Sequence, residues 1–144
     1  MRLVNGKPND QHCWTEVLGV NQCMLTARKQ MMDKYGIDMP ESVIEQFLRT
    51  GTANLSRELL DNLTDIVRGY VTGLFDALRV HGYDARLMKL LVMGGGGCLV
   101  KNFGKYDPSA VVFVDDLHAS AKGYEYMAQG VIWRNERLVR KAGD

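Results

Sequence analysis

The chain has 144 residues, of which 46% are hydrophobic and 24% charged, and its formal net charge is +1. This length fits one domain with a buried core, and the composition is ordinary for a globular protein. The near-neutral charge gives no electrostatic basis for direct binding to nucleic acid or to a membrane surface. No apolar run approaches the roughly 20 residues that cross a bilayer, and the N-terminus turns polar too early for a signal peptide. We therefore expect a single cytoplasmic domain over residues 1–144.

Cysteine usage agrees with a reducing compartment. Cys13, Cys23 and Cys98 are an odd number of thiols, far apart in the sequence, and none forms a C-x-x-C pair. Free thiols are the expected state. His12 stands next to Cys13, but no second cluster completes the four ligands of a zinc site, so we expect no bound metal.

The N-terminal residues predict a β-hairpin. A short apolar run from Met1 to Val4 is followed by turn-forming residues 5–10, and residues 13–17 are rich in β-formers. The pattern predicts two strands, residues 1–4 and 13–17, joined by a six-residue connection.

Three helices are predicted next. Apolar residues at helical spacing run from Val20 to about Tyr35, where Gly36 ends the pattern. A second helix starts near Pro40 and ends near residue 50. A third runs from Ser56, a plausible N-cap, to about residue 81.

The second half alternates strands and helices. Residues 87–93 are apolar without clean alternation, which is typical of a central parallel strand buried on both faces. A short helix over residues 98–103, a second buried strand over residues 111–114 and a final helix from about Leu117 follow. This alternation favours an α/β fold with a parallel sheet.

The most informative stretch lies between the first of these strands and the short helix. Gly94, Gly95, Gly96 and Gly97 end the strand, and a helix follows at once. Glycines lack Cβ, so backbone can approach a ligand closely and adopt positive φ. The spacing matches neither a P-loop nor the dinucleotide G-x-G-x-x-G pattern. A tight turn with close helix–sheet packing is the alternative explanation.

The order and spacing of these segments resemble a known family. Residues 91–100 resemble the adenosine motif of the actin-like ATPase superfamily, in which an apolar strand delivers glycines against the sugar and base of a nucleotide. Residues 111–124 resemble the last strand and helix of ParM/StbA-type plasmid segregation actins, with Ser120 where asparagine is usual. Residues 18–21 resemble the entry to the helix that follows that family's phosphate-binding hairpin.

The resemblance implies a particular α/β fold. The chain would be the second lobe of a ribonuclease H-like, actin-like ATPase: a three-layer domain with a mixed sheet that lacks its first strand, and a small helical insertion at residues 37–55. The family's two phosphate-binding hairpins do not appear in the sequence, so the chain reads as a C-terminal piece of a longer protein. We expect the open strand edges either to be closed by a shifted hairpin or to pair with another copy.

The resemblance also implies cofactors and partners. The full-length parent would bind ATP or ADP with Mg²⁺, with Gly94 to Gly97 and Arg57 contacting the nucleotide in this half. Its partners would be the missing N-terminal lobe, further copies in a filament, and an adaptor protein that reaches DNA. Without the two hairpins, we expect no ATP hydrolysis by this chain alone.

Several residues carry competing readings. Asp115 and Asp116 could serve metal or acid–base chemistry, but a helix-capping role is favoured at a strand-to-helix junction. Lys101 and Lys105 could approach phosphates or form a solvated face. For Arg57, the alternative to a nucleotide contact is an ordinary solvated side chain at the start of a helix. The basic residues between positions 134 and 141 are a filament contact or a solubilising end. The alternative function is a non-enzymatic interaction module that uses the same fold without nucleotide.

Overall fold

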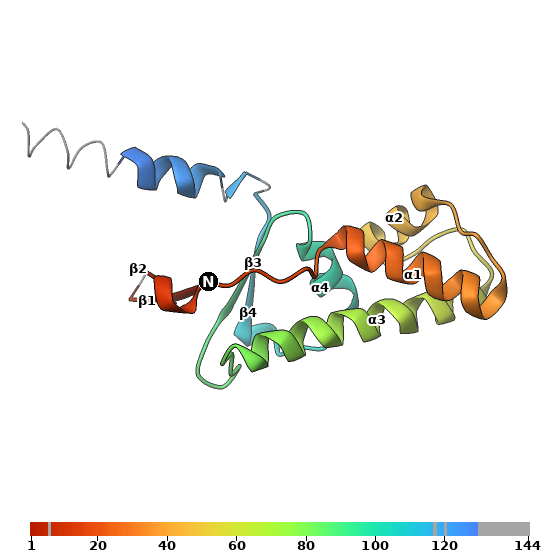
Figure 1. Ribbon diagram of the computed structural model, residues 1–144, viewed down its shortest axis with the longest axis horizontal. Coiled ribbons are helices and arrows are strands. Elements are labelled where there is room, and N and C mark those ends of the chain that lie inside the picture. The colour runs from red at the N-terminus through yellow and green to blue at the C-terminus, as the bar shows by residue number, and fades with distance from the viewer. Residues whose placement is uncertain (6, 117, 120, 130–144) are drawn as a thin grey trace, which may run out of the picture.

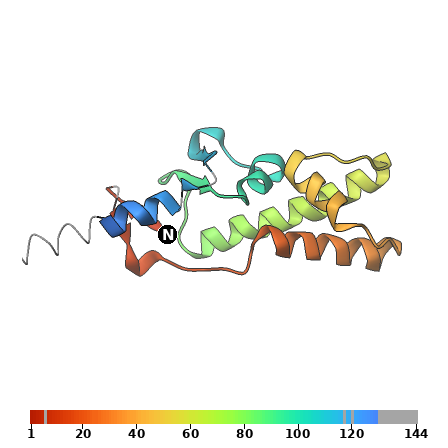
Figure 2. The same ribbon diagram turned by 90° about the horizontal axis from the view of Figure 1, so that it is seen from above.

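The computed structural model describes residues 1–5, 7–116, 118–119 and 121–129. A helical body occupies one end of the molecule and two small sheets lie at the other (Figures 1 and 2). Residues 121–129 form a further helix. The elements in chain order are β1 (Arg2–Val4), β2 (Lys7–Asn9), η1 (Asp10–His12), α1 (Val20–Tyr35), α2 (Glu41–Thr50), α3 (Arg57–Val80), β3 (Leu90–Met93), α4 (Gly97–Phe103), η2 (Pro108–Ala110) and β4 (Val111–Val114).

The predicted helix boundaries are confirmed to within a few residues, and the capping chemistry explains them. Helices α1 and α2 end at Gly36 (φ +66°) and Gly51 (φ +78°), in the left-handed conformation that glycine adopts without strain. Helix α3 begins after Ser56, whose hydroxyl accepts a hydrogen bond from the Leu59 N–H at 3.4 Å. No helix among the described residues combines the length and apolar character needed to cross a membrane.

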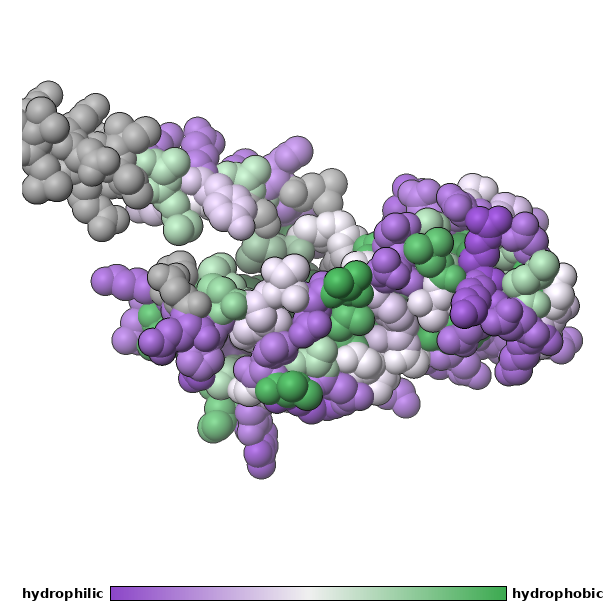
Figure 3. Space-filling view, in the orientation of Figure 1, coloured by the Kyte–Doolittle hydropathy of each residue, from purple (hydrophilic) through white to green (hydrophobic). Residues whose placement is uncertain are grey.

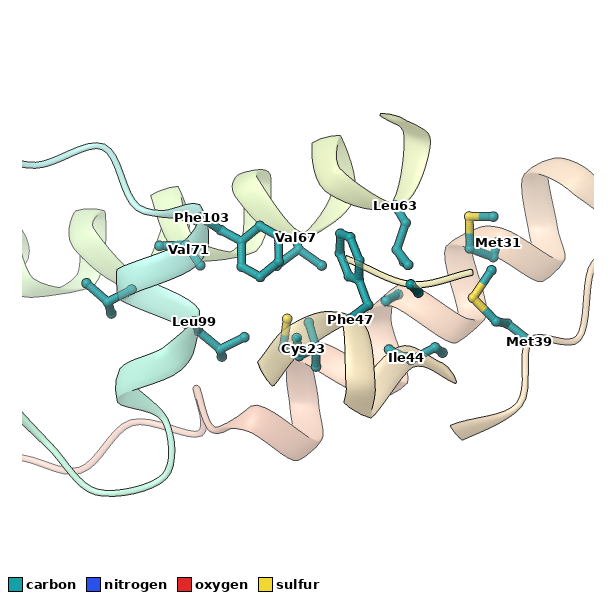
Figure 4. Close-up of a cluster of buried hydrophobic side chains, with 14 of the residues drawn as sticks. Cys23, Met31, Met39, Ile44, Phe47, Leu63, Val67, Val71, Leu99 and Phe103 are labelled. Atoms are coloured by element: carbon teal, nitrogen blue, oxygen red, sulfur yellow. The ribbon is translucent and has the colours of Figure 1, made fainter. Parts of the chain in front are cut away.

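The core lies between the four helices of the body. Helix α3 contacts α1 and α4, and α2 contacts the same two helices, so the four enclose one cluster of buried side chains. Figure 4 shows this cluster, in which the rings of Phe47 and Phe103 lie 5.0 Å apart between their centroids. Helix α2, within the predicted insertion at residues 37–55, contributes Ile44, Phe47 and Leu48 to it. The insertion therefore shares the core of the rest of the domain.

The N-terminal hairpin is real, but its predicted second strand and long connection are wrong. Strand β1 pairs antiparallel with β2, which begins at Lys7, so the turn is short and Val4 lies opposite Lys7. Asn5 has φ +51°, as expected for the Asn-Gly sequence that favours two-residue turns. Residues 13–17, predicted as the second strand, form none.

Residues 13–17 instead connect the hairpin to α1 and are held against the end of α3. The Trp14 ring stacks on the His81 ring with 4.2 Å between centroids. The same histidine also makes a polar contact, because its Nε2 lies 2.8 Å from a carboxylate oxygen of Glu16. Trp14 and Glu16 are therefore held by the end of α3 and not by pairing in a sheet.

Strands β3 and β4 pair in parallel, as predicted, with Leu90 opposite Val111 and Met93 opposite Val114. Strand β3 is shorter than the predicted residues 87–93, because it begins at Leu90 and Leu87 is exposed. The burial of the two strands corrects the prediction of a strand buried on both faces. Leu90, Val92 and Phe113 pack toward the helices, whereas Leu91, Met93 and Val112 are 47%, 44% and 42% exposed. One face of the pair is covered by α3 and α4 and the other is open within the described residues.

The predicted mixed sheet is not formed by the part of the chain that the structure describes. The hairpin and the parallel pair are separate two-stranded sheets, and the hairpin has not shifted to close the edge of β3. Pairing of these edges with another copy stays a prediction. The final helix is confirmed over residues 121–129, whereas Leu117, Ser120 and the basic residues 134–141 lie outside the described residues.

An exposed ion-pair cluster fastens the α1–α2 connection. Arg28 Nε lies 2.8 Å from Asp38 Oδ1, and Arg28 Nη1 lies 3.2 Å from Glu41 Oε1. The hydrogen bond and charge of the Arg28 guanidinium hold the pKa of the Asp38 carboxyl below its ordinary value.

This cluster predicts an acid-dependent stability. Because the Asp38 pKa is lower in the folded than in the unfolded chain, its contribution is present above about pH 4 and is lost as pH falls through the folded-state pKa. The difference in melting temperature between wild type and Asp38→Asn should therefore shrink on acidification below about pH 4. The control is Asp65→Asn on the exposed side of α3. A wild-type advantage that grew in acid would contradict the assignment.

Candidate functional site

The four glycines form a corner at the carboxyl end of β3. Because β3 and β4 are parallel, Val114 and Asp115 at the end of β4 lie at the same edge of the sheet. The corner opens on a cavity of about 440 Å³, within the size range of small-molecule sites. Its described lining consists of Arg49, Val92, Gly94, Gly95, Gly97, Cys98, Lys101, Asn102, Phe113, Val114 and Asp115.

Steric space, rather than close packing, characterises the corner. A Cβ built on Gly94 or Gly95 meets no heavy atom within 4 Å of the described chain, and one on Gly97 meets Val92 at an ordinary 3.5 Å. Only Gly94 needs glycine for its backbone, at φ +84°. Tight helix–sheet packing therefore does not explain the glycine run.

Local hydrogen bonds shape this backbone. The Gly97 N–H donates to the Gly94 carbonyl at 3.1 Å, and the Cys98 thiol donates to the Gly95 carbonyl at 3.2 Å. These hydrogen bonds within the turn fix its backbone conformation, so that Gly94 and Gly95 stay exposed beside the cavity.

The polar side chains at the cavity come from two helices and one strand end. Arg49 is supplied by the last turn of α2, Lys101 by α4 and Asp115 by the residue after β4. Asn102 fastens the two helices, because its Nδ2 donates to the carbonyls of Leu48 at 3.2 Å and Arg49 at 3.0 Å. Two cations and one carboxylate give the lining a positive balance, which suits a ligand that carries negative charge.

The structure brings together some of the predicted site residues and separates others. Gly94, Gly95 and Gly97 line the cavity, whereas a Cβ on Gly96 would lie 3.7 Å from Val20 of α1. Arg57 is the first residue of α3, a helix of 24 residues and therefore about 36 Å long. It lies outside the cavity lining, since the opposite end of α3 is the one that approaches the sheet through Phe75 and Tyr106.

Arg49 and Asn102 are the site residues that sequence reasoning missed. Arg49 belongs to a strongly amphipathic helix, a pattern that predicts its buried side but not its neighbours, and its place beside the glycines depends on α2 packing on α4. The sequence signal available was the position of Arg49 just before the helix-ending Gly51. That signal predicts favourable interaction with the helix dipole but not a neighbour 45 residues away in the chain.

The capping interpretation of the aspartate pair is confirmed at Asp116. Its Oδ1 accepts a hydrogen bond from the His118 N–H at 2.9 Å, and its Oδ2 bonds to Lys122 Nζ at 2.6 Å. The Lys122 ammonium and this N–H hold the pKa of the Asp116 carboxyl below its usual value. Among the described residues, no group of three or more His, Cys, Asp or Glu side chains is arranged to hold a metal ion.

A second cavity of about 450 Å³ lies at the amino ends of the same strands. Its lining includes Arg86 and Asp84, which are paired with each other, and the Arg86 guanidinium lowers the pKa of Asp84 to about 2. Asp107 accepts the Ser109 N–H at 2.8 Å. Asp84, Arg86 and Asp107 are thus engaged in local structure, although Lys105 also lines this cavity. Ligands of open α/β sheets bind at the carboxyl ends of the strands rather than at their amino ends. The glycine corner is therefore the better candidate.

No protein-family model, curated protein or solved structure gives a significant match to this chain.

The Asn102 bonds predict a measurable stability effect. Asn102→Ala removes two hydrogen bonds to the end of α2, and we expect a loss of about 1–2 kcal/mol in the free energy of unfolding measured with urea. Lys101→Ala, at the neighbouring exposed position, should change it by less than about 0.5 kcal/mol. Equal stabilities for the two variants would show that Asn102 does not fasten α2 to α4.

Proposed function

We propose that this chain is the adenosine-side, nucleotide-binding half of a ParM/StbA-like actin ATPase. The observation that carries the proposal is the glycine corner itself. It lies at the carboxyl end of a parallel strand pair and faces an open cavity of about 440 Å³, and Gly95 and Gly97 there have no steric or backbone need to be glycine. Bare backbone facing open space is what close approach of a planar base or a sugar requires.

The chemistry of the lining also supports a nucleotide as the ligand. Arg49 and Lys101 supply positive charge for phosphate oxygens, and Val92 and Phe113 supply apolar surface. Asp115 is the single carboxylate among the described lining residues, which is too few for a dedicated Mg²⁺ site. Mg²⁺ would therefore arrive on the phosphates of the nucleotide.

The proposal includes the finer fold and the parent protein. In it, the α/β domain is the second lobe of a ribonuclease H-like, actin-like ATPase, and the separate hairpin and parallel strand pair are the parts of that fold's sheet that the described residues form. The parent binds ATP with Mg²⁺ between two lobes, polymerises into filaments, and reaches plasmid DNA through an adaptor. Hydrolysis shifts an equilibrium of lobe closure, and this half contributes the adenosine side of the hinge.

Direct titration with ATP and ADP tests the proposal. Because only one lobe is present, we expect a Kd on the order of millimolar, about 4 kcal/mol of binding free energy, with no hydrolysis. Gly95→Val should weaken binding at least about tenfold, since the new side chain enters the space offered to the ligand. The fold should survive, because the Cβ of the variant meets no heavy atom within 4 Å of the described chain.

Gly73→Val on α3 is the matched control, since its Cβ also meets nothing within 4 Å. It should bind as wild type does. If Gly95→Val bound equally well, the glycine assignment would be wrong. If the wild-type chain bound neither nucleotide at millimolar concentration, the non-enzymatic interaction module would be the better description.

A further inference from the structure

The open face of the parallel strand pair is an unpartnered apolar surface. Leu91 and Met93 of β3 and Val112 of β4 project from it and are 47%, 44% and 42% exposed. The register places Leu91 opposite Val112 and Met93 opposite Val114, so the four side chains are contiguous. Parallel strands occur almost always with both faces covered, which makes this exposure unusual.

The helix at residues 121–129 carries a second unpartnered apolar surface. All nine of its residues are exposed, and Figures 1 and 3 show it projecting away from the helical body. At 100° per residue, Ala121, Tyr124, Met127 and Ala128 share one side of this helix. Lys122, Glu125 and Gln129 share the other side, and Gln129 Nε2 bonds to Glu125 Oε1 at 3.4 Å.

The two surfaces match in length and are joined by a short connection. A nine-residue helix is about 14 Å long, and a four-residue strand spans about 13 Å. Six residues of sequence, 115–120, separate β4 from this helix, which is within the ordinary length of a connection between a strand and the helix that packs on it.

We infer that the helix of residues 121–129 docks through Tyr124, Met127 and Ala128 on the open face formed by Leu91, Met93 and Val112 of the same chain. The face next to α3 and α4 is already occupied, so the outer face is the one left for the helix that follows β4. The short connection gives this intramolecular contact a high effective concentration, which favours it over the same contact between two copies. The inference goes beyond the proposed function and does not require nucleotide binding.

Docking has a consequence for the cavity at the glycine corner. Val114 and Asp115 line that cavity, and Asp116 directly after them holds the start of the helix through the His118 N–H and Lys122. The docked helix therefore fixes the end of β4 from which one wall of the cavity is built.

Hydrogen exchange of the intact chain tests the inference. Backbone amides of residues 121–129 should exchange at least tenfold more slowly in wild type than in Met127→Lys, and Val112→Lys on the strand should cause the same loss of protection. Tyr126→Lys is the matched control, because Tyr126 lies on the other side of the helix and is already 79% exposed. It should leave protection unchanged.

Amides of α1 and α3 report whether each variant remains folded, and light scattering reports its mass. Docking within one chain is supported if the wild-type monomer exchanges slowly and both Met127→Lys and Val112→Lys abolish this protection. Equal exchange in wild type, Met127→Lys and Tyr126→Lys would overturn the inference. Protection that appears only in a dimer would overturn it too, since the helix would then cover a second copy.

Discussion

The packing of one face of the β3–β4 pair on the helical body is the contact on which the rest of the structure depends. Leu90, Val92 and Phe113 join the strands to a core that α1, α2, α3 and α4 enclose. Without this contact a two-stranded parallel sheet is too small to persist. Because the pairing is parallel, the same contact fixes the carboxyl ends of both strands, the glycine corner and the start of the final helix at one edge.

The proposed site follows from that arrangement rather than from any one motif. The glycines supply accessible backbone, but the cations beside them belong to α2 and α4, which meet only because both pack on the shared core. Asn102 links the end of α2 to α4 through two hydrogen bonds and so determines where Arg49 lies. Core packing and ligand geometry are therefore coupled in this chain.

Local signals predicted the helices, the parallel pair and the place of the glycine corner. Gly36, Gly51 and Ser56 report helix ends directly, because capping depends on neighbouring residues alone. The wrong predictions concern features that depend on contacts between residues far apart in the sequence. Residues 13–17 have the composition of a strand but contact the end of α3. The apolar sequence around Leu91 and Met93 predicts burial on both faces of the strand, although the face that carries these two side chains is open. The cation at Arg49 was missed for the same reason, since no local pattern reports which helices meet.

The most direct test of the account is a chemical-shift map of backbone amides during titration with ADP. We expect the perturbed amides to cluster at Gly94, Gly95 and Gly97, at Lys101 and at Asp115, all of which line one cavity. Shifts that clustered instead around Arg79, Arg86 and Lys105, at the amino ends of the strands, would contradict the claim that the open glycine corner is the binding site.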